Sequence, residues 1–454
     1  MTVPALTEQV QLEIHTPIPG PRSAHLLREQ ERLESNARTY PRRLPIAVDR
    51  AFGPYLRDVD GNVFIDFLNG AGALPLGHTH PEVVEAVEAQ LRRHVHGLDL
   101  PSPIRQEFVD AHLSLLAEPM RSQTKIHFCG PTGANAIEAA IKLCKVHTGR
   151  SGIVAFQGGF HGSTHGAMSV SGLVGPKNQV GTSMPDTHFL PYSHCRRCPL
   201  GLSPSSCDTN CATYLNNTLR NDFGGVPRPA AILLELVQGE GGVIPATAEF
   251  VQRVAATAAE LGIPLIVDEI QTGYGRTGTW FAFQRYNIEP DVVVVSKAVG
   301  GIGLPVAAIL YNRRLDSWAP GTHIGTFRGH HLAFAASVAT LRVMHRDNIL
   351  DNVAEQGDWM FRQLRGLASR HAAIADVRGT GLMVGVEIAD PATGQPSGTL
   401  AAAVQAAALA RGLIVEVGGQ HGCVIRMLPP LNVSRAVVDT AIAILDESLA
   451  ELGS

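Results

Sequence analysis

The stretch that decides the fold is Pro264-Leu-Ile-Val-Asp268-Glu-Ile-Gln271-Thr-Gly-Tyr-Gly-Arg-Thr-Gly278, and it is followed by Asp291-Val-Val-Val-Val-Ser296-Lys297. Each contains a short apolar run that is bounded by Pro or Asp and lacks the alternation of a half-exposed strand. Such runs are typical of buried strands in a parallel sheet. Ligands of open α/β sheets bind at the carboxyl ends of such strands, so we expect Asp268 and Lys297 to project into one crevice.

The pair formed by Asp268 and Lys297 indicates a specific chemistry. A lysine amine can form an imine with an aldehyde. A carboxylate can hold a pyridine nitrogen protonated, so that the ring withdraws electrons. Pyridoxal phosphate requires both of these from a protein. A buried salt bridge behind a cleft that binds no phosphate is the alternative interpretation, and this pair alone does not decide between the two.

The composition argues against several other classes of protein. The chain has 454 residues, 45% of them apolar, which is enough for a large core and for two or more domains. Its net charge is -4 without a basic block, so we expect no binding to nucleic acid or to an anionic membrane. No apolar run approaches the roughly 18 residues of a membrane span, and residues 1–15 lack the pattern of a secretory signal. We therefore expect a cytoplasmic enzyme.

Short strands alternate with helices from residue 124 onward, which favours a mainly parallel sheet covered on both faces. The predicted strands of this region are residues 126–128, 153–156, 231–235, 265–268, 292–296 and 306–310. The predicted helices are residues 134–147 and 250–261.

The two ends of the chain predict a smaller α+β unit. Helices are expected at residues 331–346, 350–370, 400–410 and 437–452, and strands at residues 384–388 and 423–427. Near the N-terminus, strands are expected within residues 52–68, and these should pack with the C-terminal unit because neither piece alone buries much. Residues 1–21 hold four prolines and are expected to form an irregular arm.

Two glycine-rich segments follow predicted strands. In Gly130-Pro-Thr132-Gly133-Ala134-Asn135, small residues at a helix N-terminus leave N–H groups free for a phosphate, although an ordinary tight turn would look similar. In Gly158-Gly-Phe160-His161-Gly162, the aromatic ring can lie flat on a planar ligand, or it can be a core side chain beside a turn.

Two further polar segments carry candidate ligand contacts. The run that ends in Glu235-Leu-Val-Gln238-Gly-Glu240-Gly-Gly brings acidic groups to the same edge of the sheet, unless it forms a solvated loop. The loop Gly321 to His331 contains Thr326, which could donate to a phosphate, and Arg328, which could bind a carboxylate. The adjacent histidines at its end have no third ligand at a spacing that suits a metal.

These segments together resemble the class III, fold-type I aminotransferases that use pyridoxal phosphate. The resemblance covers nearly the whole chain, from about Asp58 to Pro430, and is most specific in the stretch from Asp268 to Gly278 with Lys297 downstream. Within that class, Gly130 to Lys142 and Gly325-Thr-Phe-Arg-Gly329 look like the 2,4-diaminobutyrate branch. The resemblance implies a large domain with a seven-stranded, mainly parallel sheet at residues 71–328. It implies a small domain at residues 329–454, completed by residues 1–70.

The resemblance also implies a role for each candidate residue. Lys297 corresponds to the lysine that binds the cofactor covalently, Asp268 to the partner of its ring nitrogen, and Gln271 to the residue near its ring hydroxyl. The expected cofactor-binding residues are Thr132, Gly133, Ala134, Phe160, His161, Glu235, Asp268, Gln271, Lys297 and Thr326. Thr326 matches a phosphate contact donated by a neighbouring subunit, which implies a homodimer with shared active sites. Glu240 and Arg426 match a movable pair that serves the substrate, with Arg328 as a further substrate residue.

Two features depart from the diaminobutyrate branch. His330-His331 replace an Asn and another polar residue. A cysteine cluster, Cys195, Cys198, Cys207 and Cys211, lies in an inserted segment. Its spacing is Cys-x2-Cys-x8-Cys-x3-Cys, which matches no common zinc template, so metal ligands, disulfides and buried free thiols all remain open.

The resulting hypothesis is an aminotransferase that exchanges a terminal amine, as in 2,4-diaminobutyrate, with 2-oxoglutarate and glutamate. Its partners are then an amine donor and a keto-acid acceptor. An amino sugar is the rival donor, because the two histidines could serve a polyhydroxylated ligand. A racemase or epimerase on the same scaffold is a rival activity, and a non-catalytic binding protein is disfavoured by the intact lysine–aspartate pair. No resident metal is expected.

Overall fold

The computed structural model describes residues 11–181 and 183–453, which fall into two compact units. The larger unit holds Glu82–Asp347, and the smaller unit combines the chain up to Pro81 with the chain from Asn348 onward. These divisions lie later in the sequence than the predicted boundaries at residues 70 and 328. The predicted N-terminal arm lies partly outside the described residues.

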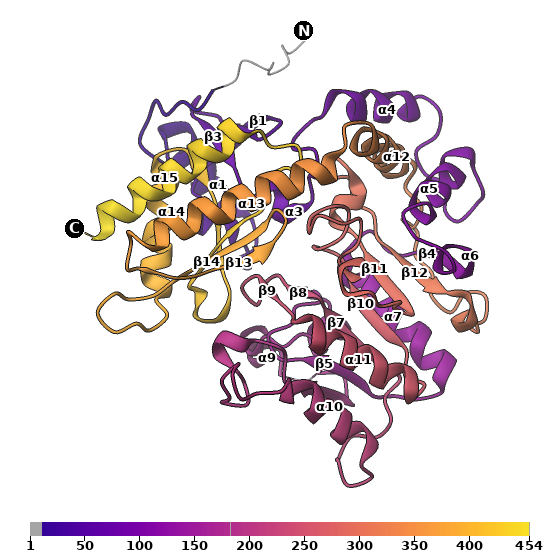
Figure 1. The fold of residues 1–454 in the computed structure, drawn as a ribbon. Helices are drawn as coiled ribbons and strands as arrows, with labels where there is room; N and C mark the ends of the chain where they lie inside the picture. Colours follow the sequence, from indigo (N-terminus) through magenta and orange to yellow (C-terminus); the bar gives the residue numbers. More distant parts are fainter. Residues whose placement is uncertain (1–10, 182, 454) are drawn as a thin grey trace. The chain divides into compact units, whose positions relative to one another are not determined.

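A seven-stranded sheet forms the centre of the larger unit and confirms the predicted fold class (Figure 1). The strand order is β4-β12-β11-β10-β7-β5-β6, and only β12 runs antiparallel to its neighbours. The strands are β4 (Thr124–Phe128), β5 (Ile153–Phe156), β6 (Thr187–Leu190), β7 (Ala231–Glu235), β10 (Leu265–Asp268), β11 (Val292–Val295) and β12 (Ala308–Asn312).

Helices cover both faces of this sheet, as the alternation predicted. On one face, α7 (Gly133–Thr148) packs in a buried cluster that includes Ile266 and Val292 of the central strands. On the other face, Phe250 of α11 (Ala248–Glu260) contacts the ring of Phe156, with ring centroids 5.5 Å apart. Since every residue of β5, β7, β10 and β11 is buried, the continuous apolar runs of these strands match their positions in the sheet.

The remaining helices of this unit connect and flank the strands. They are α4 (Pro81–Leu91), α5 (Pro103–Leu113), α6 (Met120–Gln123), α8 (His165–Ser169), α9 (Val174–Val180), α10 (Asn210–Arg220) and α12 (His331–Arg346). Short 3-10 helices are η1 (Cys195–Arg197), η2 (Ala282–Tyr286), η3 (Lys297–Gly300) and η4 (Arg313–Leu315). A two-stranded hairpin, β8 (Val237–Gln238) with β9 (Ile244–Pro245), follows β7.

The sequence missed β6, which is an edge strand paired with β5. Its residues Thr-His-Phe-Leu are only partly buried, so they do not form the apolar run that marked the central strands. The expected strand at residues 306–310 is shifted by two residues to become β12.

The smaller unit contains two four-stranded sheets and corresponds to the predicted α+β unit, except that the helix expected there at residues 331–346 belongs to the larger unit as α12. In the first, β1 (Val48–Phe52), β2 (Tyr55–Asp58) and β3 (Val63–Asp66) are joined by β15 (Leu413–Ile414), which confirms that the N-terminal strands pack with the C-terminal unit. The second contains β13 (Ile374–Thr380), β14 (Met383–Ile388), β17 (Val424–Met427) and β16 (Glu416–Gly418). The helices are α1 (Pro21–Leu33), α2 (Tyr40–Arg43), α3 (Asn69–Gly72), α13 (Ile349–Ala368), α14 (Gly398–Ala410) and α15 (Arg435–Gly453), with η5 (Gln420–Gly422).

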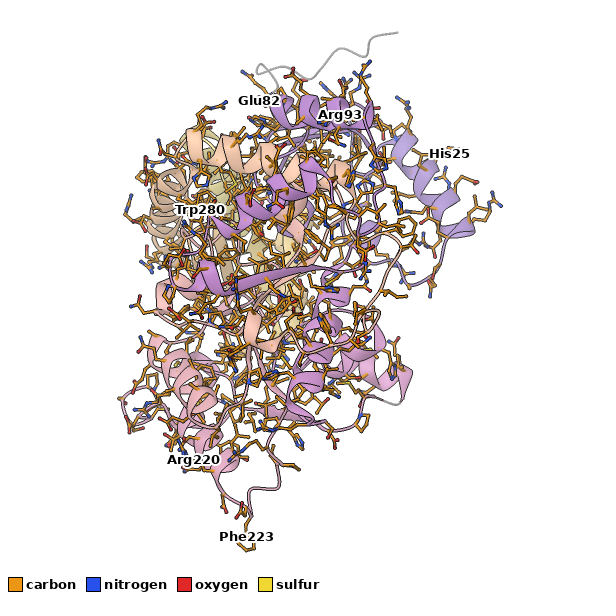
Figure 2. The ribbon with its side chains drawn as sticks, turned by 90° about the vertical axis from the view of Figure 1, so that its right-hand side faces the viewer. His25, Glu82, Arg93, Arg220, Phe223 and Trp280 are labelled. Atoms are coloured by element: carbon orange, nitrogen blue, oxygen red, sulfur yellow. The ribbon has the colours of Figure 1, made fainter. Side chains whose placement is uncertain are left out.

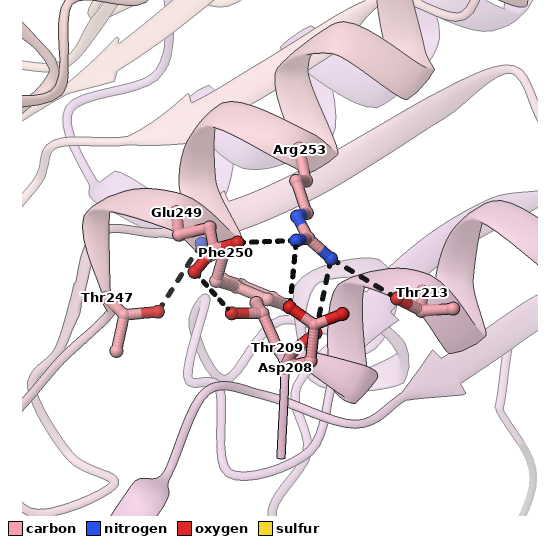
Figure 3. A network of polar contacts seen from close by, with 7 residues as sticks. All are labelled: Asp208, Thr209, Thr213, Thr247, Glu249, Phe250 and Arg253. Atoms are coloured by element: carbon pink, nitrogen blue, oxygen red, sulfur yellow. Dashed lines mark hydrogen bonds and ion pairs between the residues drawn. The ribbon is translucent and has the colours of Figure 1, made fainter. Parts of the chain in front are cut away.

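Polar contacts attach the inserted cysteine segment to α11 (Figure 3). The hydroxyl of Thr209 donates to Glu249 at 2.8 Å, and the guanidinium of Arg253 contacts the backbone carbonyl and the carboxylate of Asp208. Arg253 also bonds the hydroxyl of Thr213 on α10. After α10, the loop carries Phe223 into solvent with 96% of its surface exposed (Figure 2).

The four cysteines of this segment are free thiols in the structure. Cys211 is buried, whereas Cys195 is exposed because it lies on the short surface helix η1. Burial raises the pKa of the Cys211 thiol to about 11, and the neighbouring Cys207 and Cys195 add to the effect. Within residues 11–181 and 183–453, no group of three or more His, Cys, Asp or Glu side chains could hold a metal ion. Over the same residues, no helix has the length and apolar character to cross a membrane.

Candidate active site

Asp268 is the last residue of β10, and Lys297 follows the neighbouring strand β11, as predicted. The strands β10 and β11 are parallel, and Asp268 lies opposite Val294 in their register. The backbone N–H of Glu269 continues this pairing by donating to the carbonyl of Val294 at 3.0 Å. The segments after β10 and β11 leave the sheet at the same edge, and Asp268 and Lys297 line one cavity there.

The cavity gathers most of the predicted site residues. Nine of them line it, namely Gly133, Ala134, Phe160, His161, Glu235, Glu240, Asp268, Gln271 and Lys297. The sequence did not single out Gly162, Val237, Gly239, Ile270, Thr272 and Ser296, which complete the lining. Most of these flank a predicted residue along the chain, so extending each motif by one or two positions would have found them.

Lys297 adopts a backbone conformation that is rare for a residue with a side chain. Its φ is 48°, in the left-handed region, directly after Ser296 in extended conformation. For a residue other than glycine this conformation costs on the order of 1–2 kcal/mol. The hydroxyl of Ser296 donates to the carbonyl of Val306 at 2.9 Å and holds the turn in place. Lys297 thus lies two residues after the end of β11, where its side chain lines the cavity.

The N-terminus of α7 forms the part of the cavity that suits an anion. Gly133 and Ala134 are its first helical residues, and both line the cavity. Their backbone N–H groups lie at the positive end of a helix of 16 residues. A Cβ atom at Gly133 would come within 2.8 Å of the terminal methyl of Ile270, so a larger residue there would require the Ile270 side chain to shift. The hydroxyl of Thr132 accepts from the backbone N–H and the side-chain amide of Asn135, which makes Thr132 the cap of α7.

His161 contacts Asp268 rather than standing alone at the cavity wall. Its Nδ1 lies 2.8 Å from Oδ2 of Asp268, and both side chains are almost completely buried. Burial alone would lower the pKa of His161, but the hydrogen bond to Asp268 and the charges of Asp268 and Glu235 outweigh it, so this pKa is raised. The second oxygen of Asp268, Oδ1, accepts from the backbone N–H of Ile270 at 3.0 Å.

Glu235 holds two backbone segments of the cavity wall. Its carboxylate accepts from the N–H of Phe160 at 2.7 Å and from the N–H of Gly239 at 3.0 Å. It therefore positions both the predicted stacking aromatic and the hairpin loop that carries Glu240. Burial raises the pKa of Glu235, and the nearby charge of Asp268 adds to this rise, while His161 and the two N–H donors oppose it.

The loop around Thr326 lies in the same unit but outside the lining of this cavity. Thr326 is exposed, and its carbonyl lies 2.8 Å from Nε2 of His96. Arg328 donates to the carbonyl of His323 at 2.9 Å and forms an ion pair with Asp99.

The two adjacent histidines have contacts within the fold. Nδ1 of His330 accepts from the backbone N–H of Ala333 and caps α12. His331 is buried, and its Nε2 lies 3.2 Å from the hydroxyl of Ser102. Burial lowers the pKa of both imidazoles. These contacts give His330 and His331 structural roles in capping and packing.

Arg426 belongs to the smaller unit, on β17. It is completely buried, and its Nη1 lies 3.2 Å from a carboxylate oxygen of Glu416 on the neighbouring strand β16. The two residues are directly opposite each other in the register of these strands. The sequence did not indicate Glu416, because nothing in the order of residues shows that β16 pairs with β17.

Glu269, the residue after Asp268, is a fully buried carboxyl that supports the loop of the motif. It accepts from the hydroxyl of Thr272 and from the backbone N–H of Phe283, the latter at 2.9 Å. Burial raises the pKa of Glu269 to about 7, against the opposing effect of these hydrogen bonds.

This pKa predicts a pH-dependent stability. Folded Glu269 keeps its proton up to pH of about 7, whereas the unfolded chain releases it near 4.5, so stability falls as the pH rises between these values. At about 1.4 kcal/mol per pH unit, the loss totals about 3 kcal/mol. The free energy of unfolding of Glu269→Gln, relative to that of the wild type, is therefore expected to rise by this amount between pH 4.5 and pH 7. Urea unfolding of the apoprotein measures it.

Glu260→Gln is the control for this experiment, because Glu260 is an exposed carboxyl paired with Arg220. Its difference from the wild type should change little with pH. If the difference in free energy of unfolding between Glu269→Gln and the wild type were equally independent of pH, the pKa of Glu269 in the folded protein would not be raised.

The donor set of the cavity fits pyridoxal phosphate. It combines a lysine amine, a carboxylate at the end of a neighbouring strand, an aromatic ring on a glycine-rich loop and the N-terminus of a long helix. These are the groups needed to bind an aldehyde, a pyridine nitrogen, a planar ring and a phosphate.

Comparison with known proteins gives the family. The family model for class III aminotransferases matches residues 36–449. The chain is 46% identical to the diaminobutyrate–2-oxoglutarate aminotransferase of Rhizobium meliloti (strain 1021), over 95% of this chain and 93% of that protein. It is 42% identical to the protein of the same name from Haemophilus influenzae, over 94% of this chain and 95% of that protein.

A solved structure agrees with this comparison. The amine transaminase from an uncultivated Pseudomonas species, in its PLP-bound form, matches with a TM-score of 0.84 and 26% identity, over 93% of this chain and 98% of that chain. The family match, the fold and the gathered donor set lead to one conclusion: this chain belongs to the class III aminotransferases, which are pyridoxal-phosphate-dependent enzymes.

Proposed function

We propose that this aminotransferase moves the terminal amino group of an ω-amino donor such as 2,4-diaminobutyrate to 2-oxoglutarate, and catalyses the reverse exchange with glutamate. The observation that carries the donor assignment is the identity of 46% and 42% to two diaminobutyrate–2-oxoglutarate aminotransferases over nearly the whole chain. The cavity supports the proposal with a lysine, an aspartate and a glutamate that can meet an amine substrate.

Each residue of the cavity has its own role in the proposed reaction. When bound, pyridoxal phosphate supplies an aldehyde and an electron-withdrawing ring. The amine of Lys297 would hold the cofactor covalently when no substrate is present and would serve as general base and acid when a substrate is bound. Asp268, Gln271 and Phe160 line the cavity, where Asp268 would hold the ring nitrogen, Gln271 would serve the ring hydroxyl and Phe160 would pack on the ring. The first turn of α7 binds the phosphate through its N–H groups.

The substrate side of the proposal uses Glu240 and Arg426. An acceptor with an α-carboxylate needs a cation, whereas the reacting end of a terminal-amine donor carries no carboxylate. An arginine whose charge is neutralised by a carboxylate for one substrate and is released for the other resolves this conflict. Glu240 lies in the hairpin loop that Glu235 anchors, and Arg426 is buried beside Glu416. Arg328 is the second candidate for the carboxylate.

The amino-sugar alternative loses its main support in the contacts of the histidines. It required His330 and His331 to serve a polyhydroxylated ligand, but one caps α12 and the other is buried against Ser102. The racemase or epimerase alternative differs in stoichiometry, because an isomerase has no need of a keto-acid acceptor.

A screen of amine donors tests this proposal. The holoenzyme is mixed with 2,4-diaminobutyrate, ornithine, 4-aminobutyrate or an amino sugar, without an acceptor, and the absorbance of the bound cofactor is followed. We expect the fastest conversion to pyridoxamine phosphate with 2,4-diaminobutyrate, and recovery of the first spectrum on adding 2-oxoglutarate. Faster conversion with the amino sugar would favour that alternative. Turnover without accumulation of pyridoxamine phosphate would favour an isomerase.

We also propose that the active species is a homodimer, in which Thr326 reaches the phosphate at the active site of the neighbouring subunit. Thr326 is exposed and outside the lining of its own cavity, which leaves it available for this contact. Loss of a hydrogen bond to a charged group costs roughly 1.5–3 kcal/mol. Thr326→Ala is therefore expected to weaken cofactor binding by about 10- to 100-fold.

A hybrid experiment tests the sharing. Lys297→Ala and Thr326→Ala chains with different affinity tags are co-expressed, and heterodimers are isolated by two-step purification. One of the two hybrid sites then carries neither lesion, so at limiting cofactor the heterodimer should recover about half of the wild-type activity. Activity no higher than that of the Thr326→Ala homodimer would show that Thr326 serves its own subunit or none.

A further inference from the structure

The hairpin formed by β8 and β9 carries Glu240 to the cavity, but its own backbone pairing is too short to fix it in place. Each strand has two residues, and Pro245 in β9 has no N–H to donate to the ladder. A two-stranded hairpin is at best marginally stable by itself in water. The position of Glu240 therefore depends on groups outside the hairpin.

The hydroxyl of a buried tyrosine, Tyr192, reaches both sides of this hairpin. Its Oη lies 3.0 Å from the carbonyl oxygen of Glu235, two residues before β8, and 3.2 Å from that of Ile244 in β9. The side chain lies in the segment after β6 and packs against the ring of Phe250 on α11, with ring centroids 5.6 Å apart. Burial raises the pKa of Tyr192 well above its ordinary value, so the hydroxyl keeps its proton and remains a donor.

A second buried tyrosine bridges the base of the hairpin from another element. Tyr286 is the last residue of η2, and its Oη lies 3.4 Å from the carbonyl oxygen of Leu236 and 3.2 Å from that of Ala246. Leu236 and Ala246 flank the hairpin, and a backbone hydrogen bond of 3.0 Å joins them as well. The carbonyl of Tyr286 accepts from the side-chain amide of Gln252 on α11 at 3.2 Å, which ties this tyrosine to a helix that packs on the large sheet.

The turn between β8 and β9 holds a strained residue. Val243 is fully buried and has a φ of 52°, in the left-handed region that a β-branched residue rarely adopts. Such strain persists only where the surrounding structure fixes the backbone. A Cβ atom at Gly241 would lie 2.7 Å from the carbonyl oxygen of Gly158, so the turn also lies close against the loop after β5. Glu240 therefore extends from a backbone that is held both at its base and at its turn.

We propose that Tyr192 and Tyr286 are positioning residues for Glu240, and that through it they set the preference between a terminal-amine donor and a substrate with an α-carboxylate beside its amine. This inference rests on the proposed function, in which the carboxylate of Glu240 neutralises an arginine for the donor only. Neither tyrosine is among the described residues that line the cavity, so each acts through the carbonyls of the hairpin. Without one hydroxyl the base of the hairpin loosens, and Glu240 is held less firmly where it neutralises the arginine.

Two conservative substitutions test the hydroxyls alone. Tyr192→Phe and Tyr286→Phe keep the buried rings and remove one O–H group each. Tyr311→Phe is the matched control, because Tyr311 is a buried tyrosine on β12 of the same unit whose hydroxyl donates to Asp316 at 2.8 Å. Each holoenzyme is first checked for a cooperative thermal transition and for full cofactor content.

The first measurement is amide hydrogen exchange of the holoenzymes, which gives a readout independent of turnover. Peptides over residues 236–246 should exchange about 2- to 10-fold faster in Tyr192→Phe and in Tyr286→Phe, the range for loss of one net hydrogen bond from a local opening equilibrium. In Tyr311→Phe these peptides should exchange as in the wild type. Wild-type exchange of the hairpin after loss of either hydroxyl would overturn the proposal for that tyrosine.

The second measurement compares two amine substrates in single turnovers without an acceptor. Glutamate carries an α-carboxylate beside its reacting amine, whereas 2,4-diaminobutyrate reacts at its terminal amine. The ratio of the rate constant for 2,4-diaminobutyrate to that for glutamate should fall by about 2- to 10-fold in Tyr192→Phe and in Tyr286→Phe. Tyr311→Phe should lower the melting temperature and leave this ratio unchanged. A ratio equal to that of the wild type in both hairpin variants would refute a role in substrate preference.

Glu240→Gln separates failure of this inference from failure of the proposed function. Alone it should lower the ratio more than either tyrosine variant, because it removes the charge itself. Combined with Tyr192→Phe it should show no further loss, because the hydroxyl acts only through that carboxylate. A further loss of the full size seen in Tyr192→Phe would show another route and overturn the inference, while the role of Glu240 would stand. If Glu240→Gln leaves the ratio unchanged, the role of Glu240 is wrong, and the inference fails with it.

Discussion

Replacing Lys297 with alanine is expected to abolish transamination while leaving the cofactor bound without a covalent bond. Lys297 is the lysine among the residues that line the cavity, and it lies two residues after the end of β11 in a strained backbone conformation. We assign it both the covalent attachment and the proton transfer. General acid–base catalysis alone contributes about 10²- to 10⁴-fold, so the turnover number should fall by at least about 10⁴-fold. Steady-state kinetics with saturating cofactor measure this loss.

Reduction with borohydride and peptide mapping provide the second readout. In the wild type, the cofactor should become fixed to the peptide that contains Lys297, and in Lys297→Ala no lysine should carry it. Lys125→Ala is a matched control, because Lys125 lies on β4 of the same sheet and pairs with Asp316 at the surface. It should keep near-normal turnover. Cofactor trapped on any lysine other than Lys297 would refute the assignment.

Replacing Arg426 with alanine is expected to slow one half-reaction far more than the other. The 2-oxoglutarate half-reaction requires a cation for the α-carboxylate, whereas the donor half-reaction with a terminal amine does not. Truncating one partner of a buried, hydrogen-bonded charge pair, here an arginine with a substrate carboxylate, costs roughly 2–5 kcal/mol. The acceptor half-reaction should therefore slow by a factor of at least tens. Single-turnover measurements of the two half-reactions, each started from the appropriate cofactor form, compare the losses directly.

Arg378→Ala controls for the loss of a paired arginine in the smaller unit. Arg378 lies on β13, is 12% exposed, and pairs with Glu387 and Asp376. Its removal should lower stability and change both half-reactions alike. If Arg426→Ala also slowed the two half-reactions equally, Arg426 would stabilise the fold through its ion pair with Glu416. Arg328 would then become the candidate that binds the α-carboxylate.

Much of the large unit could be predicted because its signals are local. The buried strands β5, β7 and β10 contain continuous apolar runs, and each ends where a polar or glycine-rich motif begins. A strand that is buried on both faces tolerates few polar residues, so its limits are visible in the sequence. The prediction that Asp268 and Lys297 share a cavity followed from parallel strands ending at one edge, and the structure bears it out.

The edge strand β6 and the partners of the site residues could not be predicted in the same way. The strand β6 pairs on one side, and its partial burial leaves no apolar run. His161 lines the cavity, but nothing in the sequence indicated that its Nδ1 would lie 2.8 Å from Asp268, which is 107 positions away in the chain. Glu416 was not considered, because its pairing with Arg426 depends on two strands of the smaller unit coming together.

The sequence by itself therefore determined the class of fold, the lysine–aspartate pair and the family. Only the tertiary structure decided which groups stand behind that pair: the imidazole of His161, the carboxylate of Glu235 and the backbone donors that hold it. The physical reason lies in the range of the interactions. The apolar run of a buried strand and the capping residue of a helix can be recognised within a few neighbouring residues, whereas the charge of a buried carboxylate depends on whichever side chains the packing brings within a few ångströms.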